Sequence, residues 1–326
     1  VRRIENKLGI KGSPTAELVF NNAPAQLVGD RKLGLIKYVM SLMNGARLGV
    51  GAQSVGLAEA AYREAVKYAN EREQFGKAII NFPQVYEMLA NMRAKTDAIR
   101  TLLYETARSV DMYKSLEAIS RERKLENDER ATLKTYSRLA DALTPMLKLF
   151  SSEYANQITY DCIQVHGGSG FMKDYACERF YRDARILTIY EGTSQLQVVA
   201  AIRGVVSGAY VARIKEYEAI EVRDELKPLR QTLISLREAF EQCYEKVKEF
   251  GSSSEAFDFN SRRLVEIAGY LIMGNLLVND ANKDEMFTKS ARIMTKIAQA
   301  EIEKAITYIN NFDASILEDY KSLIAE

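Results

Sequence analysis

The chain has 326 residues, of which 47% are hydrophobic and 27% charged, and its formal net charge is +1. These values are typical of a globular protein of two or three domains, and they predict no general electrostatic attraction to nucleic acid or to an anionic membrane. Its one histidine and three widely spaced cysteines exclude a multi-histidine or CxxC metal centre and favour reduced thiols in a reducing compartment.

Strand-forming residues are concentrated between residues 8 and 28. Leu18-Val19-Phe20 is a β-favouring run, and the turn residues Asn21-Asn22-Ala23-Pro24 follow it. One or two strands do not form a stable sheet alone. We therefore expect residues 1–32 to be the end of a β-domain whose other strands lie upstream.

The pattern becomes helical from about Leu33. Between residues 33 and 72, apolar residues recur at three- and four-residue spacing. Glycine and alanine are dense around Arg47, which predicts close approach of a helix or a ligand and a buried anionic partner for this arginine. Gly76 is expected to end this helix, and Pro83 to begin another that runs to about Tyr113.

A charged run over 114–130 predicts a solvated helix or loop. Thr144-Pro145 is interpreted as the start of a helix that reaches about Val165, and Gly167–Gly170 ends it. We expect a short charged helix over 176–185 and another helix over 194–209.

Residues 211–326 predict a separate helical unit, with helices over 213–250, 255–280 and 284–311. Acids outnumber bases after residue 210, which argues against a nucleic-acid role. The apolar run from Tyr270 to Val278 is interpreted as core of this unit rather than a membrane contact. We identify neither a signal peptide nor an apolar run of transmembrane length, and we expect no stable membrane insertion. The predicted fold is mainly α.

The segment with the clearest chemical character is Ile189-Tyr190-Glu191-Gly192-Thr193-Ser194-Gln195. A carboxylate in an apolar setting can act as a general base. In the alternative interpretation, Glu191 merely opens the helix over 194–209, where a negative charge favours the positive end of the helix dipole. His166 lies in a glycine-rich turn without a nucleophile motif, so we expect a structural role for it.

Several blocks, in this order, resemble the acyl-CoA dehydrogenase family of flavoproteins. They are Lys7-Leu8-Gly9-Ile10-Lys11-Gly12-Ser13, the glycine-rich helix holding Arg47, ERxxFG at 71–76, QVHGGSGF at 164–171, ERFYRDARI at 178–186 and IYEGTSQLQ at 189–197. The resemblance covers about residues 7–210. It implies that 1–32 end the middle β-domain, that 33–210 form the C-terminal four-helix bundle, and that 211–326 are an appended helical domain, as in larger bacterial members. An N-terminal portion of the protein is expected to precede this chain.

The resemblance implies FAD-dependent α,β-dehydrogenation of an acyl-CoA in lipid β-oxidation, with electrons passed to an electron-transfer flavoprotein. Glu191 would accept the α-proton, and its backbone N–H would help to polarise the thioester carbonyl. Some family members place the base on the glycine-rich helix, immediately before its arginine. That position is Ala46 here, which leaves Glu191 without a competitor.

The family's other roles carry over by position, and no metal is implied. The residues expected to contact FAD are Arg72, Phe75, Gln164, Gly167, Gly168, Thr193 and Gln195. Those expected on the substrate side are Tyr190, Gly192, Arg203 and Arg47. The family also implies a homo-oligomer, dimer or tetramer, in the cytoplasm of a bacterium or the mitochondrial matrix of a eukaryote.

Plainer interpretations stay open. Arg72 can be a helix-end cation, Gly167-Gly168 an ordinary loop, and the RDAR stretch at 182–185 a structural ion-pair network. The long charged segment 114–143 and the 211–326 extension depart from the simple family pattern and leave chain-length preference open. An acyl-CoA oxidase that uses O2 and a non-catalytic helical assembly module are the alternative functions.

Overall fold

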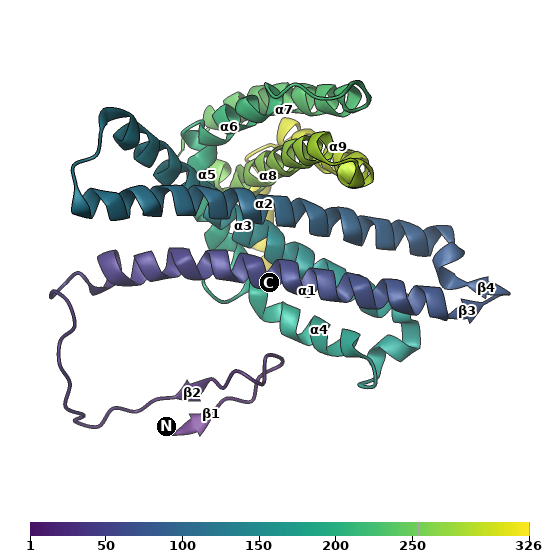
Figure 1. The fold of residues 1–326 in the computed structure, drawn as a ribbon, viewed down its shortest axis with the longest axis horizontal. Helices are drawn as coiled ribbons and strands as arrows, with labels where there is room; N and C mark the ends of the chain where they lie inside the picture. Colours follow the sequence, from purple (N-terminus) through teal and green to yellow (C-terminus); the bar gives the residue numbers. More distant parts are fainter. Residues whose placement is uncertain (253, 326) are drawn as a thin grey trace. The chain divides into compact units, whose positions relative to one another are not determined.

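The computed structural model describes residues 1–252 and 254–325, apart from the side chains of 35–37, 40, 41 and 44. The fold is 77% helix and 3% strand, which confirms the predicted mainly-α class (Figure 1). It divides into two compact units, Val1–Met92 with Ser151–Ser194 and Arg93–Phe150 with Gln195–Glu326. The sequence-based domain boundaries stay a prediction.

The first unit begins with two short strands, β1 (Arg3–Ile4) and β2 (Ala16–Glu17), which pair antiparallel with Arg3 opposite Glu17. The predicted strand over residues 18–20 is wrong. These residues lie outside any strand, and the Phe20 side chain is 80% exposed. A β-favouring sequence forms a strand only when a neighbouring strand satisfies its backbone, and none pairs with these residues in the described part of the chain.

The loop after β1 is fastened to helix α4 (Ala176–Ala184). The Ile10 backbone N–H donates to Asp183 Oδ1 at 2.6 Å, and Arg182 Nη1 donates to the Leu8 carbonyl at 3.1 Å. Gly9 lies between these contacts, where a Cβ atom would come within 2.5 Å of the Arg182 carbonyl oxygen. Arg182 also pairs with Glu178 at 2.7 Å, so this charged stretch has the structural role predicted for it.

A π-helical turn (Gly34–Val39) leads into α1 (Met40–Glu71). The buried side of α1 carries alanines at helical spacing, namely Ala58, Ala61, Ala65 and Ala69. At Gly45, Gly49 and Gly56 the predicted close approach of a helix is wrong, whereas the alternative, close approach of a ligand, stays a prediction. A Cβ at Gly45, Gly49 or Gly56 would have nothing within 4 Å, because helix contacts are made by the alanines instead.

Strands β3 (Glu73–Gln74) and β4 (Lys77–Ala78) form a hairpin after α1. Its turn residues, Phe75 and Gly76, have φ of 52° and 81°. Positive φ at both central residues is the geometry of a two-residue hairpin whose twist matches its strands. Gly76 therefore turns a hairpin and does not end the helix, which corrects the prediction.

Helix α2 (Pro83–Glu122) begins at Pro83 as predicted but continues past Tyr113, and α3 (Asn127–His166) contains Pro145 in its interior. The charged run is thus mostly solvated helix, as expected. The helix start assigned to Pro145 is wrong. Proline removes one helical hydrogen bond, but Leu143, Met146 and Leu147 beside it are fully buried, and their packing favours an unbroken helix.

After α3 the chain makes a 3-10 turn (Gly167–Phe171), α4 and a second 3-10 turn (Arg185–Thr188). The remaining helices are α5 (Ser194–Val206), α6 (Ala209–Glu218), α7 (Lys227–Lys248), α8 (Glu255–Lys283), α9 (Thr288–Asn310) and α10 (Ile316–Ala325). The predicted helix over 194–209 therefore ends early, and the one over 213–250 is divided between α6 and α7. Helix α10 was not predicted.

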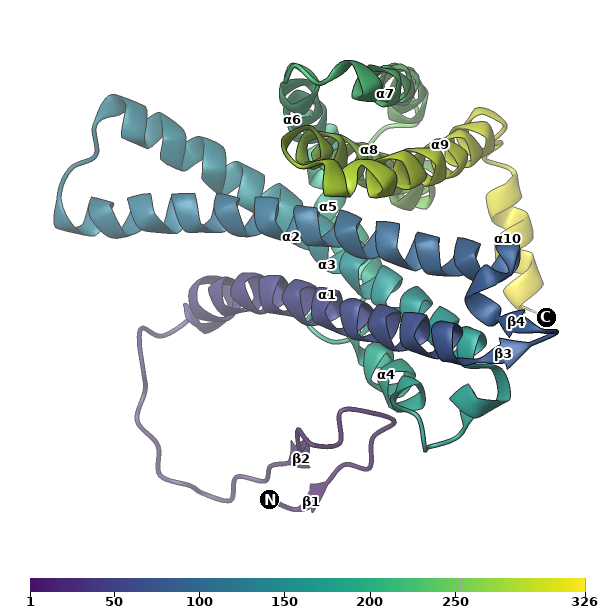
Figure 2. The same ribbon diagram turned by 45° about the vertical axis from the view of Figure 1, so that its right-hand side comes forward.

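In the second unit α8 packs against α6, α7 and α9 (Figure 2). Contrary to the expectation from the sequence, α8 is long and apolar enough to cross a membrane, but 83% of its most apolar window is buried inside the protein, as in the core helix of a globular unit. Residues 271–273 and 276–278 are all buried, which confirms the core interpretation.

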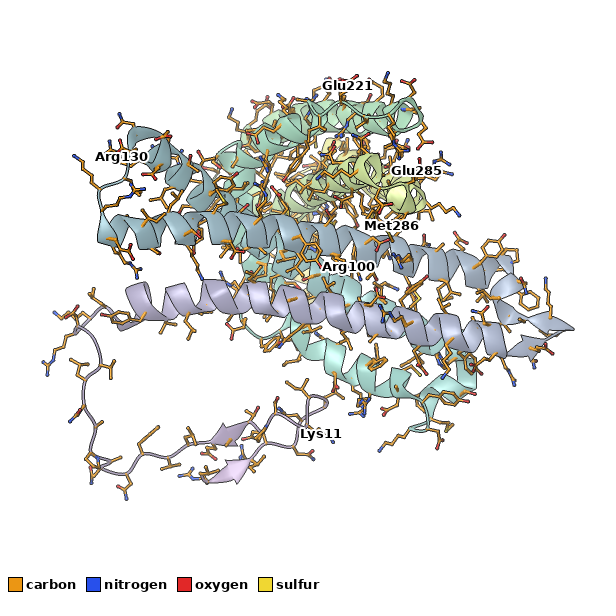
Figure 3. The ribbon with its side chains drawn as sticks, viewed as in Figure 1. Lys11, Arg100, Arg130, Glu221, Glu285 and Met286 are labelled. Atoms are coloured by element: carbon orange, nitrogen blue, oxygen red, sulfur yellow. The ribbon has the colours of Figure 1, made fainter. Side chains whose placement is uncertain are left out.

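A buried carboxylate joins α2 to α9 within this unit. Asp97 is 2% exposed and accepts from Arg93, from Arg100 and from the Ser290 hydroxyl at 2.8, 2.9 and 2.7 Å (Figure 3 labels Arg100). Two guanidinium groups and a hydroxyl satisfy the oxygens of a carboxylate that burial would otherwise disfavour.

Candidate active site

Residues 189–193, which we call the glutamate turn because they contain Glu191, join the 3-10 turn at Arg185–Thr188 to Ser194, the first residue of α5. Glu191 and Gly192 have φ of 56° and 93°. Glycine adopts such values readily, whereas a glutamate in the left-handed region loses about 1–2 kcal/mol to a clash of its Cβ. The half-buried Glu191 side chain is therefore carried by a strained backbone just before α5 begins at Ser194.

Arg47 contacts the turn from α1. Its Nε donates to the Glu191 backbone oxygen at 3.3 Å. The oxygen belongs to the peptide group between the two left-handed residues, so the arginine holds the turn at its most strained point. Arg47 thus contacts the backbone of Glu191, the predicted base.

Tyr190 is held through both its ring and its hydroxyl. Its ring and Leu57 pack against a small buried cluster of Val50, Ala155, Ala184 and Leu187. The hydroxyl donates to Oε1 of Gln53, also on α1. Burial, together with the nearby charge of Glu191, raises the pKa of Tyr190 above its ordinary value. The hydroxyl therefore keeps its proton and remains a donor.

Ser194 fixes the other end of the turn. It is 3% exposed, and its hydroxyl donates to Glu153 Oε1 on α3 at 2.6 Å. The side chain of Asn156, one helical turn further along α3, donates to the Ala184 carbonyl at 2.9 Å and fixes the end of α4. Contacts from α1 and α3 thus determine where the turn begins and ends.

The structure brings Arg47, Tyr190, Glu191 and Gly192 together and adds two residues that the sequence did not reveal, Gln53 and Glu153. These partners lie 137 and 41 residues from Tyr190 and Ser194. No local motif relates residues at such separations. The available signal was only that Gln53 lies on the same helix as Arg47.

Among the predicted cofactor residues, Arg72 and Phe75 lie at the β3–β4 hairpin. Phe75 is at the hairpin tip, where its side chain is 92% exposed and its ring meets Phe82 edge-on at 6.2 Å. A large aromatic side chain held in the open by a hairpin is available to a partner surface.

The predicted glycine turn is also open. Gln164, Gly167 and Gly168 are exposed, Gly167 has φ of 60°, and a Cβ on either glycine would meet nothing within 4 Å. His166 beneath the turn is 3% exposed, contacts the Cys162 carbonyl through Nδ1 at 2.7 Å, and stacks on Tyr68. This placement suits the structural role expected for the histidine.

Three predicted residues lie at or on α5. Thr193 is half-buried immediately before Ser194, and Gln195 and Arg203 are exposed. Gln195 and Arg203 belong to the second unit, whereas Thr193 belongs to the first with Glu191. In the described part of the chain, no group of three or more His, Cys, Asp or Glu residues could hold a metal ion.

Two family models together match residues 36–317 of the chain. "Acyl-CoA dehydrogenase, C-terminal domain" matches residues 36–205, and "Acyl-CoA dehydrogenase C terminal" matches residues 206–317. The chain belongs to the acyl-CoA dehydrogenase family. Enzymes of this family are FAD-dependent.

The chain is similar in sequence to two enoyl-CoA reductase proteins and in structure to an acyl-CoA dehydrogenase. Acryloyl-CoA reductase (NADH) of Anaerotignum propionicum is 40% identical over 63% of this chain and 46% of its own length. Caffeyl-CoA reductase-Etf complex subunit CarC of Acetobacterium woodii is 36% identical over 59% and 45%. An acyl-CoA dehydrogenase of Bacillus anthracis, in a crystal structure with FAD, has a TM-score of 0.74 and 26% identity over 98% of this chain and 58% of its own. The chain spans about half the length of the relatives it matches.

The residues present fit such a cofactor. The glycine backbone at 167–168 is open to close approach by a ligand, because no side chain lies where a Cβ would project. Gln164, which belongs to the same unit as these glycines, offers an exposed amide beside the turn.

Proposed function

We propose that this protein catalyses FAD-dependent α,β-dehydrogenation of an acyl-CoA thioester to the trans-2-enoyl-CoA, with Glu191 as the proton acceptor. The observation that carries the proposal is the strained glutamate turn, held by Arg47, Gln53 and Glu153 from two helices. A strained residue that its surroundings fix in place is a common feature of active sites. Membership of the acyl-CoA dehydrogenase family supports the assignment.

Glu191 would remove the proton next to the thioester carbonyl, a C–H group that is acidified only when the developing enolate oxygen is stabilised. The backbone N–H of Glu191 would donate to that oxygen, while Arg47 holds the Glu191 carbonyl by a hydrogen bond. The β-hydrogen would leave as hydride, and hydride acceptance is the chemistry that FAD would supply when bound. Gln164, Gly167, Gly168, Thr193 and Gln195 would hold the cofactor, with Arg72 and Phe75 contacting it from the hairpin, in a homo-oligomer.

The reverse reaction is a second candidate. The relative with 40% identity is named acryloyl-CoA reductase (NADH), and it supports enoyl-CoA reduction by the same site. Glu191 in its protonated form would then deliver the α-proton. An electron-transfer flavoprotein is the proposed electron partner in either direction, supported by the relative from a reductase–Etf complex.

The test uses the full-length protein loaded with FAD and a panel of acyl-CoA and enoyl-CoA substrates, with a dye or an electron-transfer flavoprotein as electron partner. Glu191→Gln is expected to lower kcat about 10²- to 10⁴-fold, the usual contribution of a general base, with unchanged flavin content. Glu249→Gln, at an exposed glutamate after α7, is the matched control and is expected to be silent.

Three outcomes would contradict the proposal. Unchanged turnover in Glu191→Gln would remove this residue as the base. Formation of hydrogen peroxide during turnover would favour the oxidase alternative. A flavin-loaded wild-type protein without activity on any member of the panel would favour the non-catalytic assembly module.

A further inference from the structure

Helix α1 contacts the glutamate turn through two side chains six positions apart. Arg47 reaches the Glu191 carbonyl, and Gln53 accepts the hydrogen bond of the Tyr190 hydroxyl. The first contact fixes the backbone after the base, and the second fixes the side chain of the residue before it. The base is therefore held on both sides by one helix.

The turn depends on these contacts because its own conformational preference opposes them. Glu191 at a φ of 56° lies in a region that a residue with a Cβ enters only at a cost, so an unsupported turn would relax toward the commoner negative values. Relaxation would rotate the peptide groups on either side of Glu191 and redirect its carboxylate. A displacement of about 1 Å at a reacting group can lower a rate about a hundredfold.

The hydrogen bond of Tyr190 has a defined direction. The phenol has one proton to donate, and the Gln53 amide oxygen accepts it. The ring packs against the buried cluster that contains Val50 and Leu187, so the bond to Gln53 ties an anchored ring to α1 even though the hydroxyl lies at the surface.

We propose that Gln53 is a positioning residue for the base: by accepting the Tyr190 hydrogen bond it fixes the turn in the conformation that presents Glu191 to the substrate. The inference rests on the proposed function and extends it to a residue of the glycine-rich helix to which the family resemblance assigned no role. Gln53 acts through Tyr190 and is not a catalytic residue itself.

The test is Gln53→Met in the full-length, FAD-loaded protein, since methionine has nearly the same length but no amide oxygen to accept the bond. We expect kcat to fall about three- to tenfold, the factor that one neutral hydrogen bond is worth, with KM within about twofold. Tyr190→Phe should have a similar effect, and the double variant should be no slower than the slower single variant, because both changes remove the same bond. Flavin content and melting temperature should stay at wild-type values.

Gln84→Met is the matched control, because Gln84 is exposed near the start of α2 and its side chain has no hydrogen bond within the described residues. The inference is overturned if Gln53→Met turns over at the wild-type rate, if the two single losses multiply in the double variant, or if KM alone changes. A failure of the proposed function differs from these results, because the wild-type protein would then be inactive or Glu191→Gln would be silent.

Discussion

Glu105 is a carboxylate of the second unit that accepts hydrogen bonds from three different residues. It accepts from Arg108 on its own helix α2 at 3.0 Å, from the Tyr217 hydroxyl on α6 at 2.8 Å, and from Arg213, also on α6. Burial pushes the pKa of Glu105 upward, but the two arginines and the tyrosine outweigh it and hold the pKa below its ordinary value. The ionised form therefore joins α2 to α6.

Glu105→Gln is expected to lower the free energy of unfolding by about 1–3 kcal/mol at pH 7, because it leaves buried donors without a charged acceptor. The depressed pKa contributes stability that is complete above the ordinary glutamate pKa of about 4.3 and is lost as the pH falls through the lower folded-state value. The difference between wild type and variant should therefore be constant from pH 7 to about 5 and shrink at more acid pH.

Urea unfolding followed by circular dichroism across this pH range checks the prediction. Glu122→Gln, at an exposed glutamate at the end of the same helix, provides the control and should show no such pH dependence. A gap that persists unchanged in acid would mean that ionisation of Glu105 contributes nothing.

How much of the site could be predicted differs from residue to residue. Glu191 and the glycines of the 167–170 turn lie within contiguous motifs, so the sequence alone placed them on turns. Gln53 and Glu153 have no motif, because each becomes significant only when α1 or α3 is brought against a turn far away in the chain. The left-handed backbone of Glu191 was also beyond sequence reasoning, since glutamate favours other conformations.

At the scale of elements, periodicity predicted which segments are helical but not where they end. Pro83 starts α2 because proline suits the first helical position, whereas Pro145 looked like a second start and lies inside α3. Local signals favour a break there, and burial of the neighbouring side chains overrides them. The strand predicted at Leu18–Phe20 was wrong for the opposite reason. The local signal favours a strand, but no strand in the described part of the chain pairs with these residues.

Close packing around α8 gives an element-scale prediction. A Cβ at Gly269 would lie 2.0 Å from the Phe150 ring, which is itself 5% exposed and edge-on to Tyr270. Gly269→Ala should therefore destabilise the protein by about 1–3 kcal/mol, the usual effect of overpacking a core. Denaturant unfolding measures this value.

Gly56→Ala is the matched control, because it makes the same change in the interior of α1 where a Cβ would meet nothing within 4 Å. It should be neutral or stabilise by about 0.5–1 kcal/mol, since alanine favours the helix. Phe150→Leu should restore part of the stability of Gly269→Ala. Equal effects of the two alanine substitutions would contradict the packing argument.

At the scale of the whole molecule, two compact units share two uninterrupted helices. Two of the three unit boundaries fall inside long helices, after Met92 in α2 and after Phe150 in α3, and the third follows Ser194, the first residue of α5. Unfolding one unit alone would break the backbone hydrogen bonds of α2 and α3 where these helices pass from one unit to the other. We therefore expect the two units to unfold together, although the chain matches two separate family models.

Labelling of the three buried cysteines can test whether the two units unfold together. Cys162 and Cys177 are fully buried in the first unit, and Cys243 is 2% exposed in the second, where burial raises its pKa to about 11. Buried, protonated thiols are poor nucleophiles. A thiol reagent at pH 8 should label none of them in the native protein over minutes, and should label all three over the same narrow range of urea concentration.

Single Cys→Ser variants assign the labelled positions. Labelling of Cys243 at clearly lower urea concentration than Cys162 would show that the units unfold independently. Rapid labelling without urea would contradict the burial of these thiols.

The left-handed backbone at Glu191 also limits which amino acids position 191 favours. Glycine, or asparagine to a lesser degree, would relieve the clash at a φ of 56° and make the turn more stable than glutamate does. Selection for thermal stability alone would therefore replace glutamate at this position. A library screened only for heat resistance should lose the carboxylate and retain the fold, so stability and chemistry place opposite demands on this residue.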